Sequence, residues 1–324
     1  MGRPVTGPGR HHTTHRIDIA APADVVYGLI ADAAAWPLRF TPSIHVERLP
    51  LGGAAERLRI WALANGEVTN WTSHRELDAR RRRITFRQER SSPPVASMGG
   101  EWIVEQDGSG TRLTFDHDFD VVDDDPAGLA WVNRAVDGNS KAELANLKQL
   151  AEAGDREAAG LEFSFEDSVL VKGSADTVYE FLYRAKRWPD RLPHVRHAEV
   201  GEDVENIQSL RMETSAKDGS VHTTESIRIC FPDTRRIVYK QTVTPPLMAA
   251  HTGEWTVHEP AGESGGGVLV TSRHTVLVNE ANIGRVLGEG ATAEKARKVI
   301  RDALGGNSMA TLTLAKAFAE ADHA

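Results

Sequence analysis

The stretch Asn70–Leu77 brings an indole, a hydroxyl and a guanidinium together if it forms a β-strand. Side chains alternate between the two faces of a strand, so Trp71, Ser73 and Arg75 share one face with Leu77. A permanent cation on such a face is either a paired structural charge or part of the wall of a pocket. In a pocket, its N–H groups can donate hydrogen bonds to an oxyanion that develops during a reaction.

Two further side chains that can carry protons are expected to face the same interior. His117 lies among apolar residues on one face of the alternating segment Thr111–Val121, and Glu143 falls on the apolar stripe of a long helical pattern. The alternative explanation is a buried Arg–Glu pair with a hydrogen-bonded histidine, since breaking such a pair costs about 3–5 kcal/mol. Convergence of Arg75, His117 and Glu143 from three elements favours a site.

The sequence is a tandem repeat, with an offset of 152 or 153 residues through the first two-thirds of each copy. Trp36-Pro37 returns as Trp188-Pro189, and Gly100-Glu101-Trp102 returns as Gly253-Glu254-Trp255. A repeat of about 150 residues is a common domain size. We therefore predict a flexible N-terminal tail (1–14), a first domain (15–154), a linker (155–160) and a second domain (161–324).

Each copy combines an opening strand, a short helix, several alternating segments and a long C-terminal helix. In copy one, His15–Ala20 alternates as a strand, and residues 43–121 contain alternating segments separated by turn residues. Between residues 127 and 153 the apolar residues recur at helical spacing. This order predicts an α+β class with two tandem helix-grip domains. In each, a curved antiparallel sheet wraps around the long helix and leaves an internal cavity.

Copy two repeats part of the candidate site. Arg228 corresponds to Arg75 and His274 to His117, whereas Thr311 stands where copy one has Glu143. Copy one is therefore the more complete site. Weaker candidates for ligand contact include a repeated aromatic residue, two asparagines beside the helical stripes, a histidine that copy one lacks and two hydroxyl residues near Arg228: Trp36, Asn139, Asn307, His251, Thr224 and Ser226.

Composition limits the function classes. The 324 residues include 38 Lys and Arg against 46 Asp and Glu, a net charge of −8 that disfavours general nucleic-acid binding. The single cysteine, Cys230, excludes an internal disulfide and a zinc site built from paired cysteines. No apolar run approaches the roughly 18 residues of a membrane span. We expect a cytoplasmic protein with no membrane association.

Charged and histidine-rich segments outside the core are weaker signals. Residues His11, His12 and His15 fall in or beside the predicted tail without a carboxylate partner, so we do not expect a metal site there. A basic run follows the key strand. Such a run is usually a solvated turn, but on a chain of net negative charge it is also a candidate docking place for an acidic partner. It consists of Arg80, Arg81, Arg82 and Arg83.

The motif Trp71-Thr72-Ser73-His74-Arg75 resembles one family in particular. Together with the upstream Trp36-Pro37 and with Glu143, Leu147 and Leu150 on the final helix, it is similar to the aromatase/cyclases of bacterial type II polyketide synthases. These proteins belong to the START/Bet v1-like superfamily, and the two-copy layout resembles their di-domain members. The resemblance extends from His15 to the end of the chain.

The resemblance implies a role in polyketide antibiotic biosynthesis without a cofactor or a metal. The implied activity is aldol closure and dehydration of the first ring of a poly-β-ketone, which an acyl carrier protein holds as a thioester. Di-domain members are associated with ketoreduced chains that close between carbons seven and twelve. Some single-domain members have a pocket tyrosine where this chain has Ser43 and Val195, so a mechanism that uses that phenol is not expected here.

The implied roles can be distributed over the candidate residues. Arg75 would donate to the oxyanion, His117 would move the proton, and Glu143 would orient it or share the work. Ser73 and Trp71 would position the chain, while copy two would promote dehydration or hold the far end of the substrate. A non-catalytic carrier of lipids or polyketides with the same cavity is the alternative function.

Overall fold

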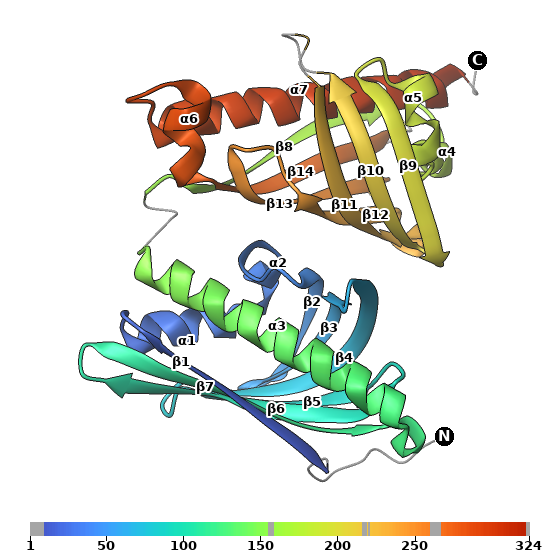
Figure 1. Cartoon of the computed structure of the whole chain (residues 1–324). Coiled ribbons are helices and arrows are strands. Elements are labelled where there is room, and N and C mark those ends of the chain that lie inside the picture. Colours follow the sequence, from blue (N-terminus) through green and yellow to red (C-terminus); the bar gives the residue numbers. More distant parts are fainter. Residues whose placement is uncertain (1–9, 155–158, 216–218, 220, 260–266, 322–324) are drawn as a thin grey trace. The chain divides into compact units, whose positions relative to one another are not determined.

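The computed structural model describes residues 10–154, 159–215, 219, 221–259 and 267–321. The chain forms two compact units, unit 1 (Met1–Gly154) and unit 2 (Asp155–Ala324). Each contains one antiparallel sheet and a long C-terminal helix (Figure 1). The predicted α+β class with two tandem helix-grip domains is confirmed. Residues 155–158 of the predicted linker lie outside the described residues.

Unit 1 is a seven-stranded sheet with one long helix, α3, lying across it (Figure 1). The strands follow the order β1-β7-β6-β5-β4-β3-β2, so all neighbours except β1 and β7 are consecutive in the chain. The elements of unit 1 are β1 (His11–Ile19), α1 (Ala23–Ala31), α2 (Trp36–Arg39), β2 (Ser43–Gly52), β3 (Ala55–Ala64), β4 (Glu67–Asp78), β5 (Arg83–Arg90), β6 (Val95–Asp107), β7 (Gly110–Val121) and α3 (Pro126–Glu152).

Unit 2 repeats this plan, with the strand order β8-β14-β13-β12-β11-β10-β9. It has an additional short helix, α6, before the long helix α7. The elements of unit 2 are β8 (Glu162–Val171), α4 (Ala175–Tyr183), α5 (Trp188–Arg191), β9 (Val195–Val204), β10 (Ile207–Ser215), β11 (Val221–Phe231), β12 (Arg236–Val243), β13 (Met248–His258), β14 (Val268–Val278), α6 (Ile283–Leu287) and α7 (Ala293–Ala321).

The long helix α3 begins where the sequence supplies a cap. The Asp125 carboxylate accepts hydrogen bonds from the N–H groups of Ala127 and Gly128, and Pro126 occupies the first turn, where no N–H is needed. One face of the helix is then buried at helical spacing, which confirms the stripe expected from the sequence. Its buried residues include Val132, Val136, Ser140, Leu144, Leu147 and Ala151. The helix therefore forms one wall of the interior.

The β3–β4 hairpin determines which side chains face each other at the key strand. Asn65 and Gly66 have φ values of 52° and 86°, as the two central residues of a type I′ turn require. This turn pairs Glu56 on β3 with Arg75 on β4. Paired residues of neighbouring strands share one face of the sheet, so a carboxylate and a guanidinium are brought together.

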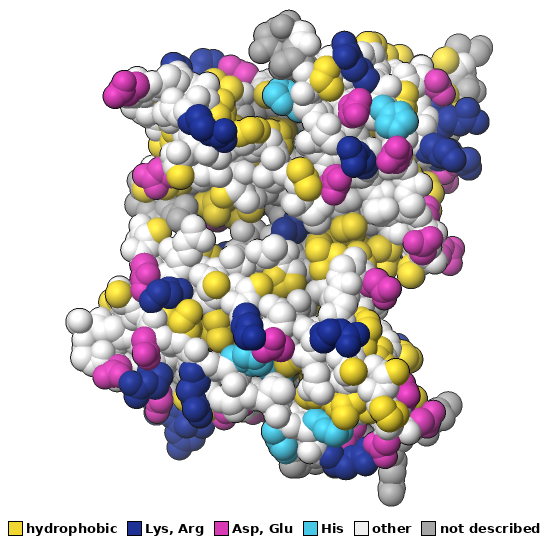
Figure 2. Space-filling model, in the orientation of Figure 1, with side chains coloured by type: hydrophobic (Ala, Val, Ile, Leu, Met, Phe, Trp, Pro, Cys, Tyr) yellow, Lys and Arg dark blue, Asp and Glu magenta, His cyan; other side chains and the backbone are white. Residues whose placement is uncertain are grey.

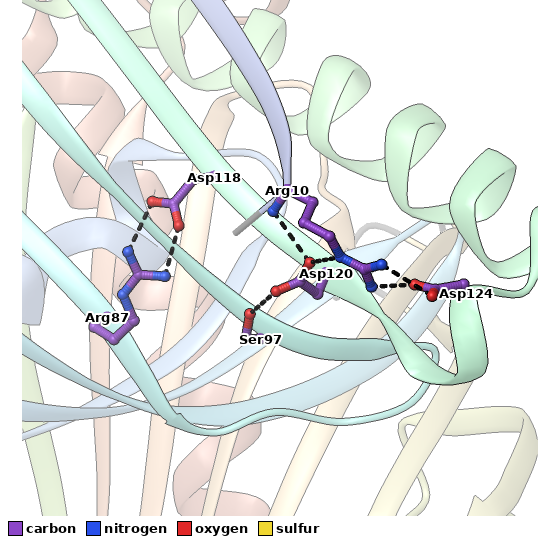
Figure 3. A network of polar contacts seen from close by, with 6 residues as sticks. All are labelled: Arg10, Arg87, Ser97, Asp118, Asp120 and Asp124. Carbon is purple, nitrogen blue, oxygen red and sulfur yellow. Dashed lines mark hydrogen bonds and ion pairs between the residues drawn. The ribbon is translucent and has the colours of Figure 1, made fainter. Parts of the chain in front are cut away.

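The first strand starts earlier than the sequence predicted. β1 begins at His11, inside the expected tail. Arg10 is also attached to the sheet, because its backbone and side chain donate hydrogen bonds to Asp120 on β7 (Figure 3). The Nε2 atom of His15 lies 3.1 Å from Asp137 on α3, so the expectation of no carboxylate partner was wrong. These partners are more than 100 residues away in the chain, where sequence spacing gives no guide.

Candidate active site

Unit 1 contains a cavity of about 150 Å³ between α3 and the inner face of the sheet. An engineered protein cavity of about this volume binds benzene, so the space suits one six-membered ring. Aromatic and aliphatic side chains form most of its wall. The polar part includes Ser73, Arg75, His117, Asn139 and Glu143, all of which the sequence analysis named. The cavity therefore brings together the three groups expected to do chemistry.

One end of the cavity is more open than the other. Thr69, Trp71, Ser73 and Arg75 line it along β4. Thr69 and Trp71 are partly exposed, whereas Ser73 and Arg75 are only 2% and 1% exposed. Trp131 near the start of α3 lines the cavity and is also partly exposed. Along β4 the lining side chains therefore become more buried from Thr69 to Arg75, and we infer that the entrance lies toward Thr69.

Arg75 is anchored by an ion pair and by the end of a helix. Its Nε donates to the Glu56 carboxylate, its Nη1 to the Ile30 carbonyl oxygen at 3.1 Å and its Nη2 to the Ala31 carbonyl oxygen. These two carbonyl groups lie at the C-terminus of α1, where a cation is favourable. The Trp36 ring covers the guanidinium carbon at 5.1 Å from the ring centroid. Burial lowers the pKa of Arg75, and the charge of Glu56 opposes that shift.

This arrangement combines both explanations that the sequence allowed for Arg75. A buried Arg–Glu pair exists, but the carboxylate comes from Glu56 and not from Glu143. A guanidinium has five N–H donors, and three of them make the hydrogen bonds described above. Two donors remain on a side chain that lines the cavity. Arg75 is therefore a structural cation that still has hydrogen-bonding capacity for a ligand.

Arg228 repeats this anchor in unit 2 with a neutral partner. Its Nη1 donates to the Gln208 amide oxygen at 2.9 Å and to the Tyr183 carbonyl oxygen at 3.3 Å, and its Nη2 donates to the Leu182 carbonyl oxygen at 2.6 Å. Trp188 lies 5.2 Å from the guanidinium carbon. Because both arginines bind the end of the first helix of their unit, the repeat of this residue has a structural cause independent of any reaction.

His117 and Glu143 are both uncharged at neutral pH. Burial lowers the pKa of His117 to about 3, and its Nδ1 has no hydrogen-bond partner among the described residues. Burial raises the pKa of Glu143 to about 8. The Glu143 side chain is surrounded by protein on most sides. It is partly exposed because it faces the cavity. A pKa near the working pH suits a group that takes and returns a proton, so Glu143 is the better proton carrier.

The remaining wall residues of unit 1 contact the backbone as well as the cavity. The Ser73 hydroxyl donates to the Arg87 carbonyl oxygen at 3.2 Å, and the Asn139 amide donates to the Leu63 carbonyl oxygen at 2.9 Å. These contacts fix both side chains in place. Trp71 presents its ring to the cavity near the entrance. The unit-1 residues predicted from the sequence are thus brought together.

In unit 2, His274 is the centre of a buried hydrogen-bond network. Its Nδ1 lies 2.9 Å from His251 Nε2 and 3.2 Å from the Tyr239 hydroxyl. Its Nε2 lies 2.6 Å from the Ser308 hydroxyl and 3.1 Å from the Ser272 hydroxyl. Burial lowers the pKa of His274 to about 4. The sequence indicated the two histidines separately and did not indicate their contact or the three hydroxyl partners.

Other unit-2 candidates differ in their surroundings. Thr224 and Thr311 are buried, and Ser226 is partly buried. The Thr311 hydroxyl donates to the Asn307 carbonyl oxygen within α7 at 2.9 Å. The side chain of Asn307 is exposed. The prediction that Asn307 parallels Asn139 at an internal site is therefore wrong, because its position on α7 faces solvent.

Known proteins share this architecture along their whole length. A family model described as polyketide cyclase/dehydrase and lipid transport matches residues 10–152. The actinorhodin polyketide synthase bifunctional cyclase/dehydratase of Streptomyces coelicolor is 44% identical over 322 residues, covering 96% of this chain and 98% of that protein. The chain belongs to the polyketide cyclase family.

Other relatives support the assignment of the chain to the polyketide cyclase family. The granaticin polyketide synthase bifunctional cyclase/dehydratase of Streptomyces violaceoruber is 44% identical over 309 residues, covering 94% of this chain and 93% of that protein. The crystal structure of BexL, a di-domain aromatase/cyclase of the BE-7585A biosynthetic pathway, has a TM-score of 0.82 at 49% identity, with 96% of this chain and 99% of that chain covered. The di-domain START/Bet v1-like fold expected from the sequence is confirmed.

Glu56 is the main residue of this cyclase-family site that the sequence analysis missed. A signal for it was present, because Asn65-Gly66 marks a two-residue hairpin turn. Because the strands are antiparallel, each residue of β3 pairs with the residue of β4 whose number brings the sum to 131. Glu56 therefore lies opposite Arg75. Helical spacing alone indicates the carboxylate of Glu143, whereas Glu56 is indicated only when the turn sets the register of the two strands.

A glycine at the same repeat position shapes both interiors. A Cβ atom at Gly100 would lie 2.7 Å from the Phe86 ring, and one at Gly253 would lie 2.2 Å from the Tyr239 hydroxyl oxygen. Either distance is shorter than a real contact, so only glycine lets the aromatic ring of one strand lie across the next. In unit 1 this puts Phe86 against His117, with ring centroids 5.7 Å apart.

The arginine run is not a free basic patch. Arg82 pairs with Asp24 at 2.5 Å, and Arg83 lies 3.1 Å from Glu101. Figure 2 shows cationic and anionic side chains interspersed over the visible surface. The run also follows the C-terminal end of β4, at the opposite end of that strand from the cavity entrance. None of the described helices is both long and apolar enough to cross a membrane.

Proposed function

We propose that the chain closes and dehydrates the first ring of a poly-β-ketone held by an acyl carrier protein, with ring closure in unit 1. The proposal includes a ketoreduced chain and closure between carbons seven and twelve. It rests mainly on the unit-1 cavity, where Arg75, His117 and Glu143 line a space that suits one ring. The family to which the chain belongs, and relatives described as cyclase/dehydratases, support the same reaction class.

The aldol step requires a proton carrier. A methylene group between two carbonyl groups gives up a proton, its carbon bonds to a distant carbonyl carbon, and the resulting alkoxide takes up a proton. At neutral pH most Glu143 carboxyl groups are protonated and a minority are ionised, because the pKa is about 8. The ionised form can take the methylene proton, and the carboxylic acid that results can give a proton to the alkoxide. His117, with a pKa of about 3, is a weak base. The two residues thus exchange the roles suggested by the sequence, and His117 becomes a neutral positioning group.

The second requirement is a fixed donor for the oxyanion. Arg75 is held in place by Glu56 and the α1 carbonyl groups before substrate enters, and its two remaining N–H groups are available to the developing alkoxide. The apolar wall selects one folding of the chain by holding two distant carbons in contact. Neither aldol closure nor loss of water changes the overall oxidation state, so the proposal needs no redox cofactor.

Delivery from the carrier protein favours the entrance end. We infer that a thioester arm enters near Thr69 and Trp131, because the exposure of the β4 lining residues increases from Arg75 toward Thr69. The arginine run lies at the other end of β4, and three of its members are already paired with carboxylates. We therefore place carrier docking at the entrance and not at residues 80–83.

Reconstitution with a minimal type II polyketide synthase and mass spectrometry of the products tests the proposal. We expect Glu143→Gln to slow formation of the correctly closed ring by about 10²-fold or more. Arg75→Lys should remove roughly 2.7–4 kcal/mol of barrier stabilisation. Asn307→Ala, at an exposed position, is the control and should behave as wild type.

The same experiment separates catalysis from simple binding. A carrier of lipids or polyketides would hold the ketide without changing its fate, so neither substitution would alter the product distribution. If Glu143→Gln and Arg75→Lys remain folded and give the wild-type rate and products, the catalytic proposal is wrong and a binding function is favoured.

A further inference from the structure

Strand β5 presents an amide side chain, that of Gln88, to the unit-1 cavity. Gln88 is one of the residues that line the cavity, and it pairs across the strands with Ser73. Paired residues share one face of a sheet, so the amide lies beside the Ser73 hydroxyl on the inner face. Phe86, two residues earlier on β5, pairs with Arg75. A strand rises about 3.4 Å per residue, so Gln88 lies roughly 7 Å farther toward Thr69 than the level of Arg75.

Two contacts fix the orientation of the Gln88 amide. The Ser91 hydroxyl donates to its Oε1 at 2.7 Å, and its Nε2 donates to the Met98 sulfur at 3.7 Å. The turn that carries Ser91 is held in place as well, because the Ser92 hydroxyl donates to the Asn70 carbonyl oxygen at 2.5 Å. Since Met98 also lines the cavity, the amide nitrogen lies at the cavity wall, while the amide oxygen is turned toward Ser91.

The Gln88 amide nitrogen has hydrogen-bonding capacity that the protein does not use. An amide group has two N–H donors, and a thioether is only a weak acceptor. Among the described residues, Nε2 donates to the Met98 sulfur and to no other acceptor. At least one N–H group therefore remains for a ligand in the cavity. A packing role alone would be met by an apolar side chain of the same length, such as a second methionine.

Unit 2 repeats the glutamine but not its orientation. Gln241 pairs with Ser226 as the unit-1 glutamine pairs with Ser73, and in both units the strand register shifts by one residue directly after this pair. Three positions farther on, the Thr244 hydroxyl donates to the Met248 carbonyl oxygen. The Oε1 atom of Gln241 has no hydrogen-bond partner in the part of the chain that the structure describes. The strand frame is thus shared, whereas the hydroxyl that orients the amide occurs in unit 1.

We propose that Gln88 is a specificity-determining residue, whose amide N–H binds one ketone oxygen of the chain segment between the new ring and the thioester. This inference rests on the proposed function, because closure at Arg75 and Glu143 leads that segment past β5 toward Thr69. Ketone oxygens accept hydrogen bonds and cannot donate them, so they match an oriented N–H group. With one ketone held, the chain cannot slide by one ketide unit. The amide therefore helps to decide which two carbons meet, in addition to the shape of the apolar wall.

The distribution of ring isomers tests this role. Gln88→Met removes the amide and keeps an unbranched side chain of the same length, and Gln241→Met is the matched control in unit 2. In the reconstituted synthase with full-length protein, chromatography and NMR spectroscopy distinguish the isomeric rings. We expect Gln88→Met to lower the ratio of the normal closure to all other closures by about 10-fold, while Gln241→Met keeps the wild-type ratio. A merely structural role would reduce the amount of every product and leave the ratio unchanged.

A binding measurement tests the same contact without ring closure. In full-length protein labelled with ¹⁵N-glutamine, the side-chain amide signal of Gln88 is the one that Gln88→Met lacks. We expect acetoacetyl-pantetheine to shift this signal and butyryl-pantetheine, which has a methylene group in place of the ketone, to leave it in place.

Two results would overturn the role of Gln88 independently of the proposed function. One is a wild-type ratio of closures in Gln88→Met, measured while the ring still closes. The other is an equal response of the Gln88 signal to the two pantetheine probes. By contrast, failure of the wild-type chain to close any ring contradicts the proposed function itself, and the two probes then still decide whether Gln88 recognises a ketone.

Discussion

Replacing Glu56 by glutamine tests whether the anchor of Arg75 depends on charge. The side chain is 2% exposed and pairs with Arg75, itself 1% exposed. Removing one member of a buried pair costs about 3–5 kcal/mol. The glutamine oxygen can still accept from Arg75, as Gln208 does from Arg228 at 2.9 Å, so we expect the lower end, about 3 kcal/mol. For a domain of this size that lowers the unfolding temperature by roughly 6–12 °C.

Calorimetry measures the loss of stability, and ring-closure assays on the same preparations measure the loss of activity. Glu89→Gln breaks a surface pair with Arg57 and is the control; it should change neither stability nor product. Glu56→Gln should unfold earlier and also lower the rate of correct closure at temperatures where it is folded, because the Arg75 donors are less fixed. If Glu56→Gln and Glu89→Gln unfold at the same temperature, the charge of Glu56 does not hold Arg75 and the reasoning fails.

Three further predictions concern titration and the surface. The folded pKa of Glu143, about 8, lies above its ordinary value of 4.5, so wild-type stability should fall as pH rises from 4.5 to 8; urea unfolding of Glu143→Gln should lack this fall. The folded pKa of His117, about 3, lies below 6.5, so stability should fall as pH drops from 6.5 to 3, and His117→Gln should lose less; an identical acid profile would contradict this. Arg82→Ala should leave the Michaelis constant for carrier-bound substrate unchanged, whereas a large increase would place docking at the arginine run.

The fold and the unit-1 site could be predicted largely because their signals are periodic. Alternation placed Ser73 and Arg75 on one face, and helical spacing placed Glu143 on the inner stripe of α3. What could not be predicted depends on contacts between distant strands. The ion pair of Arg75 with Glu56 requires the hairpin register, and the attachment of β1 to β7 joins opposite ends of the unit.

The roles of the titratable residues were harder to predict than their positions. A sequence gives His117 its ordinary pKa near neutrality, but burial without a partner moves that pKa to about 3. The same burial moves the pKa of Glu143 to about 8. The sequence also grouped Asn307 with Asn139 as a candidate, because both lie beside the buried stripe of their helix, but only Asn139 lines a cavity, and Asn307 is exposed on α7.

The glycine shared by β6 and β13 makes the duplicated scaffold easy to diversify. Gly100 and Gly253 leave room for an aromatic ring to cross the neighbouring strand, and this ring is a phenyl group in unit 1 and a phenol in unit 2. One oxygen atom distinguishes Phe86 from Tyr239, and it adds a hydrogen-bonding group that lies 3.2 Å from His274 Nδ1. After a duplication, a single nucleotide change of this kind is enough for twin compartments to begin to diverge in chemistry.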